Sequence, residues 1–314
     1  MIHWGITALN HGSSLAVFKD HKLVMHKTSP CDELDSELTV PALNLGSPDR
    51  IFWYERPWIK KARQIRAGQF STAMDLSTLP SRHLRQFRYA PVIYTPHHAS
   101  HAAAGYYTSP FDHCAVIVLD AIGEFECATI WEGSNDNLRK VWSRSYPNSL
   151  GLFYSAFTQL LGLKPIKDEF ILQQMSDQGD PRRFYNSVRR YFGHWTLDLK
   201  YNFHRGVQNW YCDLGNLQDQ CDLAAAVQRV FEVQIEYVLD EAHSRIKTDC
   251  LVYMGGCAMN SKANSRYVEP KYKYRWSLPN PGDPSSSIGA VLYHTKQRVN
   301  NWQWEPVKHL AINV

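Results

Sequence analysis

Short apolar runs separated by polar turns open the chain. Residues 2–9 have the composition of a strand, residues 10–14 that of a turn, and residues 15–18 and 23–26 those of two further strands. The pattern predicts a β-meander. A tight polar turn of this kind is either a plain hairpin turn or, because it exposes backbone N–H groups and hydroxyls, a site for an anion such as phosphate.

The same plan returns in the middle of the chain. Residues 115–119 form an apolar run typical of a buried strand, residues 120–124 form a polar turn, and residues 127–131 extend again. One strand–turn–strand pattern used twice predicts two similar lobes that face each other across a cleft.

Helical periodicity marks two later segments. Residues 149–161 and 222–246 carry apolar stripes at helical spacing, and the second is followed by an apolar strand at residues 250–254. Gly255 and Gly256 come next, before a polar helix start. A strand, two glycines and a helix start let a ligand such as a nucleotide lie against bare backbone, although a Gly-Gly pair alone is weak support for such a site.

A histidine-rich stretch, PHHASHAAAGY at residues 96–106, carries the first candidate chemistry. Its small residues favour a helix, Pro96 suits the first turn, and the spacing places His97 and His101 on one helix face. Two imidazoles on one face are either half of a metal site or two ordinary partly buried histidines. Asp283 precedes another short helix, where it either caps that helix or binds a metal.

Composition narrows the classes of protein. The chain has 314 residues, 44% of them hydrophobic, and a net charge of +4, so it is long enough for one large or two medium domains and has only mild affinity for anions. Seven scattered cysteines without a C-x-x-C pair predict reduced thiols in a cytoplasm. Neither a secretory signal nor an apolar run of roughly 18 to 20 residues is visible, which predicts a soluble protein without membrane contact.

Two clusters of basic residues are interleaved with aromatic ones. Each is either a nucleic-acid contact with stacking aromatics or the solvated face of an amphipathic helix. The cationic members are Arg56, Lys60, Lys61, Arg63 and Arg66 in the first cluster and Arg182, Arg183, Arg189 and Arg190 in the second.

The motifs, taken together and in order, resemble the NodU/TobZ/CmcH carbamoyltransferase family. They are HHxSHA, VLDxxGE, SLGxFYxAxTxxLG, DxAAxxQ, GGxAxN and GDxxSxIGA, at residues 97–102, 118–124, 149–162, 222–228, 255–260 and 282–290. The resemblance implies a mixed α/β, two-lobed actin/hexokinase-like fold around a nucleotide cleft. We expect one lobe at residues 1–112, with the first meander and the histidine helix, and a second lobe at residues 113–314, with the Gly-Gly turn and the late aspartate.

The resemblance also assigns site residues. It implies a divalent metal, Fe²⁺ first and Zn²⁺ or Mn²⁺ as chemically acceptable alternatives, held by His97, His101, Asp120 and Asp283. It places His11 as the candidate catalytic base, with His98 as the second choice. The residues expected to line the nucleotide or donor are Ser13, Gly123, Glu124, Gly255, Gly256 and Asn260.

The reaction implied is O-carbamoyl transfer. A YrdC-like domain of the family makes carbamoyl-adenylate from carbamoyl phosphate and ATP, and the actin-like domain passes the carbamoyl group to a hydroxyl. No YrdC-like region is recognisable in this chain, which predicts a separate donor-forming chain and suggests a viral or mobile-element origin. The acceptor is left open between a hydroxymethylated pyrimidine in nucleic acid or a nucleotide and a sugar or antibiotic hydroxyl. A non-catalytic actin-like binding module and a homodimer also remain open.

Departures from the family pattern affect the anion contacts. The first turn reads His11-Gly12-Ser13-Ser14 where the family has His-Asp-Ala-Ser, and Ile171 stands where the family has a lysine. We therefore expect the donor to be held differently or the activity to have changed.

Overall fold

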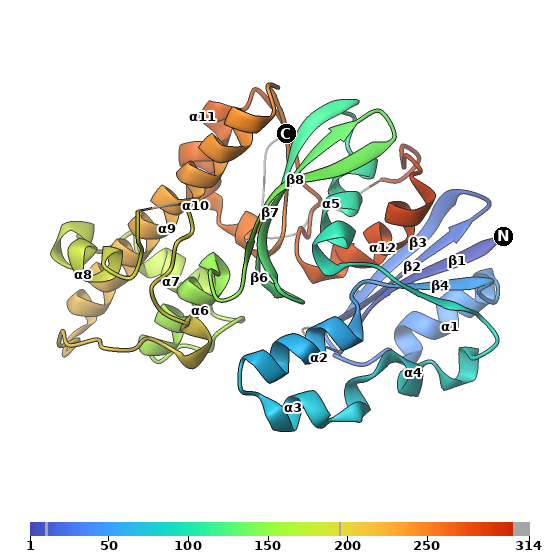
Figure 1. The fold of residues 1–314 in the computed structure, drawn as a ribbon, viewed down its shortest axis with the longest axis horizontal. Coiled ribbons are helices and arrows are strands. Elements are labelled where there is room, and N and C mark those ends of the chain that lie inside the picture. Colours follow the sequence, from blue (N-terminus) through green and yellow to red (C-terminus); the bar gives the residue numbers. More distant parts are fainter. Residues whose placement is uncertain (10–11, 195, 304–314) are drawn as a thin grey trace.

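Two five-stranded sheets of the same design form the framework of the molecule (Figure 1). The computed structural model describes residues 1–9, 12–194 and 196–303. The strand order is β3-β2-β1-β4-β5 in the first sheet and β8-β7-β6-β9-β10 in the second. In both, three antiparallel strands are followed by two strands that run parallel to the first. The predicted repetition of one plan is confirmed, and the repeat is longer than the sequence indicated.

The strands contain the predicted apolar runs. Those of the first sheet are β1 (Ile2–Thr7), β2 (Ser13–Lys19), β3 (Lys22–Ser29), β4 (Arg50–Trp53) and β5 (Val92–Tyr94). Those of the second are β6 (His113–Gly123), β7 (Glu126–Ser134), β8 (Asn137–Ser145), β9 (Cys250–Met254) and β10 (Tyr274–Trp276).

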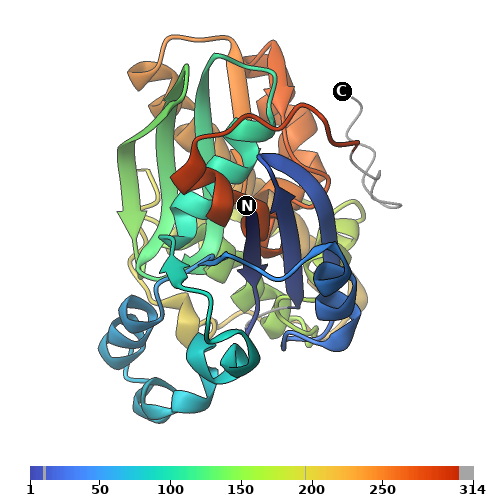
Figure 2. The ribbon, with the colours of Figure 1, turned by 90° about the vertical axis from the view of Figure 1, so that its right-hand side faces the viewer.

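Helices fill the space between the sheets and cover the outer face of the second (Figure 2). They are α1 (Ser36–Leu45), α2 (Pro57–Arg66), α3 (Phe70–Met74), α4 (Pro80–His83), α5 (His97–Thr108), α6 (Leu150–Leu160), α7 (Glu169–Met175), α8 (Tyr185–Arg189), α9 (Leu217–Arg245), α10 (Ser261–Ala263), α11 (Glu269–Lys271) and α12 (Ser286–Thr295). Short 3₁₀ or π turns are η1 (Leu76–Thr78), η2 (Arg85–Phe87), η3 (Pro181–Arg183), η4 (Phe203–Arg205), η5 (Gly256–Met259), η6 (Asn264–Val268) and η7 (Asp283–Ser285). Helix α9 begins before the predicted stripe because the Asn216 side chain caps it at Asp219.

The histidine helix α5 is wholly buried between the two sheets. Its alanines share one core cluster with Val116 and Val252 of the second sheet and Ile288 of α12. A side chain at Gly289 would collide with the α5 backbone at Ser100, and one at Gly105 would collide with Val252. Small residues therefore allow the close packing that the sequence predicted for this helix.

The second core lies on the other face of the second sheet. Helices α6 and α9 pack there, and aromatic rings fill the space beneath them, including an edge-to-face pair between Phe153 and Phe157 with centroids 5.2 Å apart. Helix α12 comes late in the chain yet packs on α5 and on β1 of the first sheet. The first sheet ends with β5 at Tyr94 and the second begins with β6 at His113, whereas α12 packs on the first sheet. The predicted domain boundary between residues 112 and 113 stays a prediction.

The first basic–aromatic cluster forms helix α2 and the residue before it. Lys61 Nζ donates to the carbonyl of Asp75 at 2.7 Å, and Arg63 Nε donates to the carbonyl of Glu124 at 3.2 Å. Arg56 pairs with the carboxylate of Glu124 at 2.5 Å. These three charges bind other segments of the protein, and Lys61 and Arg63 are buried, so they belong neither to a solvated helix face nor to an open nucleic-acid surface.

Two further sequence expectations concern composition. All seven cysteines are free. Within the described part of the chain, every helix is too short or too polar to cross a bilayer.

Candidate metal centre

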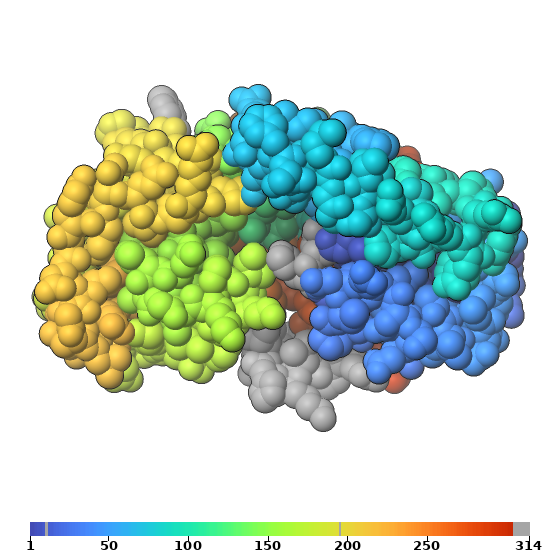
Figure 3. Space-filling model, turned by 90° about the horizontal axis from the view of Figure 1, so that it is seen from below, coloured from blue at the N-terminus to red at the C-terminus, as the bar shows by residue number. Residues whose placement is uncertain are grey.

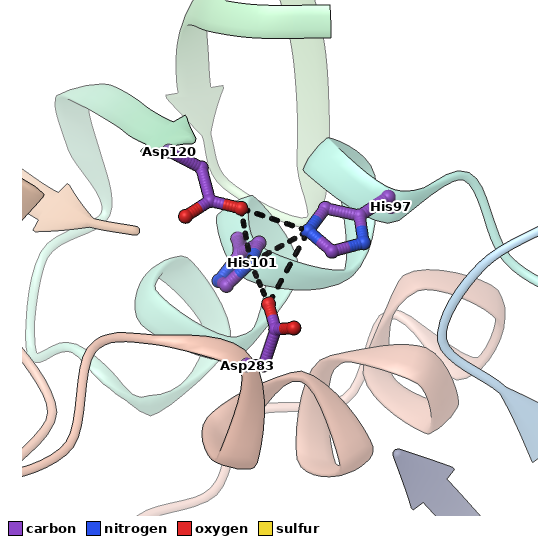
Figure 4. Close-up of side chains that lie close together, drawn as sticks. All are labelled: His97, His101, Asp120 and Asp283. Atoms are coloured by element: carbon purple, nitrogen blue, oxygen red, sulfur yellow. Dashed lines mark hydrogen bonds and ion pairs between the residues drawn. The ribbon is translucent and has the colours of Figure 1, made fainter. Parts of the chain in front are cut away.

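Four side chains from three separate segments meet between the sheets (Figure 4). His97 and His101 project from the first turns of α5, Asp120 lies near the end of β6, and Asp283 begins η7. One nitrogen or oxygen atom from each lies within 4.8 Å of the others. The structure therefore brings together all four residues that the resemblance assigned to a metal.

The nitrogen and oxygen atoms of these four side chains lie close to one another. The His97 and His101 Nε2 atoms are 3.1 Å apart. His97 Nε2 lies 3.2 Å from Asp120 Oδ2 and 3.4 Å from Asp283 Oδ1, and His101 Nε2 lies 3.2 Å from that same Asp283 oxygen. Two imidazole nitrogens and two carboxylate oxygens aimed at one point are a donor set that suits a divalent first-row metal.

Burial and charge change the proton affinities in this cluster. Burial alone would lower the pKa of His97, but Asp283 and Asp120 outweigh it and hold that pKa well above its ordinary value. Burial likewise opposes ionisation of both carboxylates, yet His97 lowers the pKa of Asp120 to about 2 and, with His101, the pKa of Asp283 well below its usual range. Without a metal, His97 is thus a buried cation between two anions, and a divalent cation would replace its proton.

Hydrogen bonds hold the Asp120 carboxylate and the segment that carries Asp283. The Gly256 N–H donates to Asp120 Oδ1 at 3.2 Å, which ties the Gly-Gly turn directly to the cluster. On the other side, Ser14 Oγ donates to the carbonyl of Pro284 at 2.7 Å, and His26 Nε2 lies 3.1 Å from the same oxygen. The first lobe therefore holds the segment that carries Asp283.

The expected nucleotide-lining residues have internal partners around this centre. Ser13 Oγ donates to the carbonyl of Glu33 at 3.1 Å, and Glu124 binds Arg56. A side chain at Gly123 would overlap the imidazole of His97, so glycine is required there. Asn260 caps α10 through Ala263 N.

The two candidate bases are placed differently. His11 lies outside the described residues. His98 is fully buried, its Nδ1 lies 3.0 Å from Thr129 Oγ1, and burial together with His97 lowers its pKa well below the ordinary value. It is therefore a neutral side chain beside the rings of His97 and His101, and its assignment as a base stays a prediction.

A cavity that sequence reasoning missed lies against helix α9. It measures about 500 Å³ and is lined by α9, α10 and η6. Gln228 on α9 lines it and exchanges two hydrogen bonds of 3.0 Å with Asn260. Arg229 and Arg266 also line it and flank the ring of Tyr267 at 5.7 and 5.8 Å. Gln228 is the last residue of the DxAAxxQ motif, and this motif is the signal in the sequence that could have pointed to the cavity.

Figure 3 shows a hollow between the N-terminal residues and the segment near residue 170. Two lobes of equal strand order, with the polar cluster between them, form the two-lobed actin/hexokinase-like fold. HypF from T. kodakarensis is similar in fold, with a TM-score of 0.53 at 10% sequence identity over 94% of this chain and 47% of HypF. The predicted fold class is confirmed.

Sequence comparison gives the family. The chain belongs to the family described as carbamoyltransferase N-terminus, whose model matches residues 59–292. An uncharacterized protein of Synechocystis is 28% identical over 95% of this chain and 57% of its own length. Nodulation protein NolO of Bradyrhizobium diazoefficiens is 26% identical over 62% of this chain and 37% of NolO. The resemblance seen in the motifs is confirmed, and the chain spans less than two thirds of the length of these relatives.

Proposed function

We propose that the chain is the transferase domain of an O-carbamoyltransferase that uses a metal held by His97, His101, Asp120 and Asp283. The observation that carries this proposal is the convergence of these four side chains beside a Gly-Gly turn in a member of this family. Fe²⁺ is the first choice for the metal, and Zn²⁺ and Mn²⁺ have compatible chemistry. When bound, the metal supplies a Lewis acid that polarises the carbamoyl carbonyl.

The donor in this proposal is carbamoyl-adenylate, made from carbamoyl phosphate and ATP. Its base would occupy the cavity beside α9, where the planar guanidinium groups of Arg229 and Arg266 can stack on it. Its phosphate would lie near the turn at Gly255 and Gly256, as the family resemblance implies. The adenylate is the leaving group, and its departure breaks the anhydride bond to the carbamoyl carbon.

The acceptor hydroxyl needs a base to take its proton as its oxygen bonds to the carbamoyl carbon. His11, which lies outside the described residues, remains the first candidate because the family resemblance assigns it. His98 is the second, although it is buried against Thr129. The acceptor is either a hydroxymethylated pyrimidine or a small-molecule hydroxyl, and the donor is made by a YrdC-like domain.

A non-catalytic binding module is the other class of function. That interpretation expects the four polar side chains to have lost their mutual geometry. Their ligand atoms instead lie within 4.8 Å of one another, with both histidines buried and both aspartates partly buried, which supports the transferase.

The test is incubation of the purified chain with synthetic carbamoyl-adenylate and a panel of nucleotide, DNA and sugar hydroxyls, followed by mass measurement. We expect one acceptor to gain the mass of one carbamoyl group. Mixing the chain with carbamoyl phosphate and ATP should give no product until a YrdC-like protein is added. Intact acceptors throughout, with metal bound, would contradict the proposal.

Nucleotide binding is expected to depend on Arg266. Arg266→Ala removes a planar guanidinium group that would stack on the base of the nucleotide. It also removes one of the cations beside Glu232, since Arg266 Nη1 lies 3.3 Å from Glu232 Oε2. We expect ADP affinity to fall roughly tenfold by calorimetry, as a lost cation–π contact of about 1–2 kcal/mol implies. Lys273→Ala, which removes an exposed cation outside the lining of this cavity, is the control and should bind ADP normally. Equal affinity for both variants would place the nucleotide elsewhere.

Metal affinity is expected to fall as the solution is acidified. A ligating imidazole must be neutral, and the raised pKa of His97 means that the metal must displace a proton near neutral pH. Calorimetry in buffers of different ionisation enthalpy should report about one proton released per metal. Affinity should rise with pH until the solution passes the pKa of His97 in the folded protein. The ion pair of His97 with Asp120 and Asp283 also stabilises the metal-free fold. This contribution to the free energy of unfolding is complete below the ordinary histidine pKa of about 6.5, and it is lost as the pH rises through the raised pKa of His97 in the folded protein. Metal affinity independent of pH would contradict this account.

A further inference from the structure

The described part of the chain leaves an apolar surface on helices α2 and α3 open to solvent. Trp58 on α2 is 62% exposed, and Phe70 and Met74 on α3 are 63% and 73% exposed. The two helices pack against each other, and buried Lys61 on α2 donates to the carbonyl of Asp75, at the end of α3, at 2.7 Å. The exposed side chains therefore stand on two helices that are fixed to each other. Large apolar side chains exposed in this way are typical of a contact with a partner.

The same segment is strongly basic. Residues 56–89 contain eight Lys and Arg residues and one acidic residue. Its ion pairs with described residues are Arg56–Glu124 and Lys60–Glu55. Four further arginines are exposed and form no ion pair with a described residue: Arg66, Arg82, Arg85 and Arg88. We call these four arginines, together with the three apolar side chains above, the basic patch.

An acidic counterpart lies in helix α1 and just before it. Residues 31–49 contain five acidic residues and no Lys or Arg. Glu33 and Glu37 are exposed, and neither forms an ion pair with a described residue. Val40 and Leu43 follow Glu37 at intervals of three residues, which places neighbours in this series side by side on the helix, and they are 53% and 41% exposed. We call these four residues the acidic patch.

Figure 3 shows both segments on one face of the molecule, α1 in blue and the segment from α2 to η2 in cyan and teal. A nucleic acid or an anionic membrane that met the arginines would also meet the glutamates of the acidic patch, and like charges repel each other across an interface. A partner that itself carries one acidic and one basic apolar patch avoids this repulsion. The chain is such a partner for a second copy of itself.

We propose that this face binds the same face of a second copy of the chain, related to the first by a twofold axis. The rotation brings each acidic patch onto the basic patch of the other copy, so two identical contacts form together and the assembly closes as a dimer. Opposite charges pair across each contact, and the apolar side chains of the two patches leave water together. This dimer depends neither on the metal nor on the transferase activity.

The first test is the mass of the chain in solution. Sedimentation equilibrium should give twice the monomer mass of 36.2 kDa at high concentration, with dissociation to the monomer on dilution. A chain that is monomeric at every concentration would overturn the proposal. Binding of DNA or anionic vesicles by a chain that stays monomeric would also overturn it and would assign the arginines to a polyanion.

Charge reversal tests the pairing of the two patches. The variants are Glu33→Lys/Glu37→Lys in the acidic patch and Arg85→Glu/Arg88→Glu in the basic patch. Each variant alone should raise the dimer dissociation constant at least about tenfold, because it places like charges across both contacts. An equimolar mixture of the two should dimerise again, since both contacts of the mixed dimer join opposite charges. A mixture that stays monomeric, or single variants that dimerise as tightly as the original chain, would overturn the proposal.

The apolar part of the contact has its own variant. Phe70→Ser/Met74→Ser should weaken dimerisation at least about tenfold, because two large apolar side chains are no longer buried by the partner. The controls are Tyr274→Ser, which removes a side chain that is 49% exposed on β10, and Lys247→Glu/Lys273→Glu, which reverses two exposed cations of the second lobe. Both controls should dimerise like the original chain, and circular dichroism should show that every variant is folded. Equal dimerisation of Phe70→Ser/Met74→Ser and Tyr274→Ser would place the contact on another face.

Discussion

Replacement of His101 by alanine should abolish both metal binding and carbamoyl transfer while the fold survives. His101 is fully buried, and its Nε2 atom lies 3.2 Å from Asp283 Oδ1 and 3.1 Å from His97 Nε2. Because loss of a group that merely supports a metal ligand costs about 10–100-fold in affinity, loss of a ligand should cost roughly 100-fold or more. Metal content by mass spectrometry and the carbamoyl-transfer assay measure the two effects.

The matched control is His113→Ala, which removes an exposed histidine that pairs with Glu132 at 3.5 Å on the surface. This variant should retain metal and activity. Circular dichroism should show that both variants are folded. Full transfer activity in the His101 variant would rule out the metal mechanism, even if metal affinity fell.

Gly123→Ala should damage the metal centre without removing any ligand. The added methyl group would overlap the ring of His97, and Gly123 closes the β6–β7 pairing opposite Glu126, so the backbone has little room to retreat. The imidazole must then rotate away from Asp120 and Asp283. We expect a loss of about 1–3 kcal/mol in the free energy of unfolding, as for other overpacked sites, and a large loss of metal affinity.

Gly215→Ala is the control for this substitution, because a side chain there would meet only Asp213, at ordinary contact distance. Thermal melting and metal titration compare the two variants. If Gly123→Ala binds metal as well as Gly215→Ala does, the arrangement of His97 seen here is not the one that binds the cation.

The framework was accessible from the sequence because it depends on local patterns. Alternating apolar runs and polar turns gave both meanders, and the spacing of His97 and His101 gave one face of α5. The return of α12 to the first sheet could not be predicted, since it depends on Gly5 allowing the backbone of α12 to approach β1, which no periodicity records.

Only half of the candidate metal centre could be predicted from residue spacing. Asp283 lies 182 positions from His101, and no local pattern links two residues so far apart, so its assignment required the family resemblance. The partner of His98, Thr129, and the burial of Arg63 are products of tertiary packing. Buried polar partners of this kind cannot be found from residue spacing because they join different elements.

The most direct test of the account is a crystal structure of the chain grown with Fe²⁺ or Co²⁺ and recorded at the absorption edge of the metal. The account predicts a single strong anomalous peak bonded to His97 Nε2, His101 Nε2, Asp120 and Asp283, and no such peak in crystals of Asp283→Ala. An anomalous peak at another position, or a cluster that stays metal-free in the presence of excess cation, would contradict it.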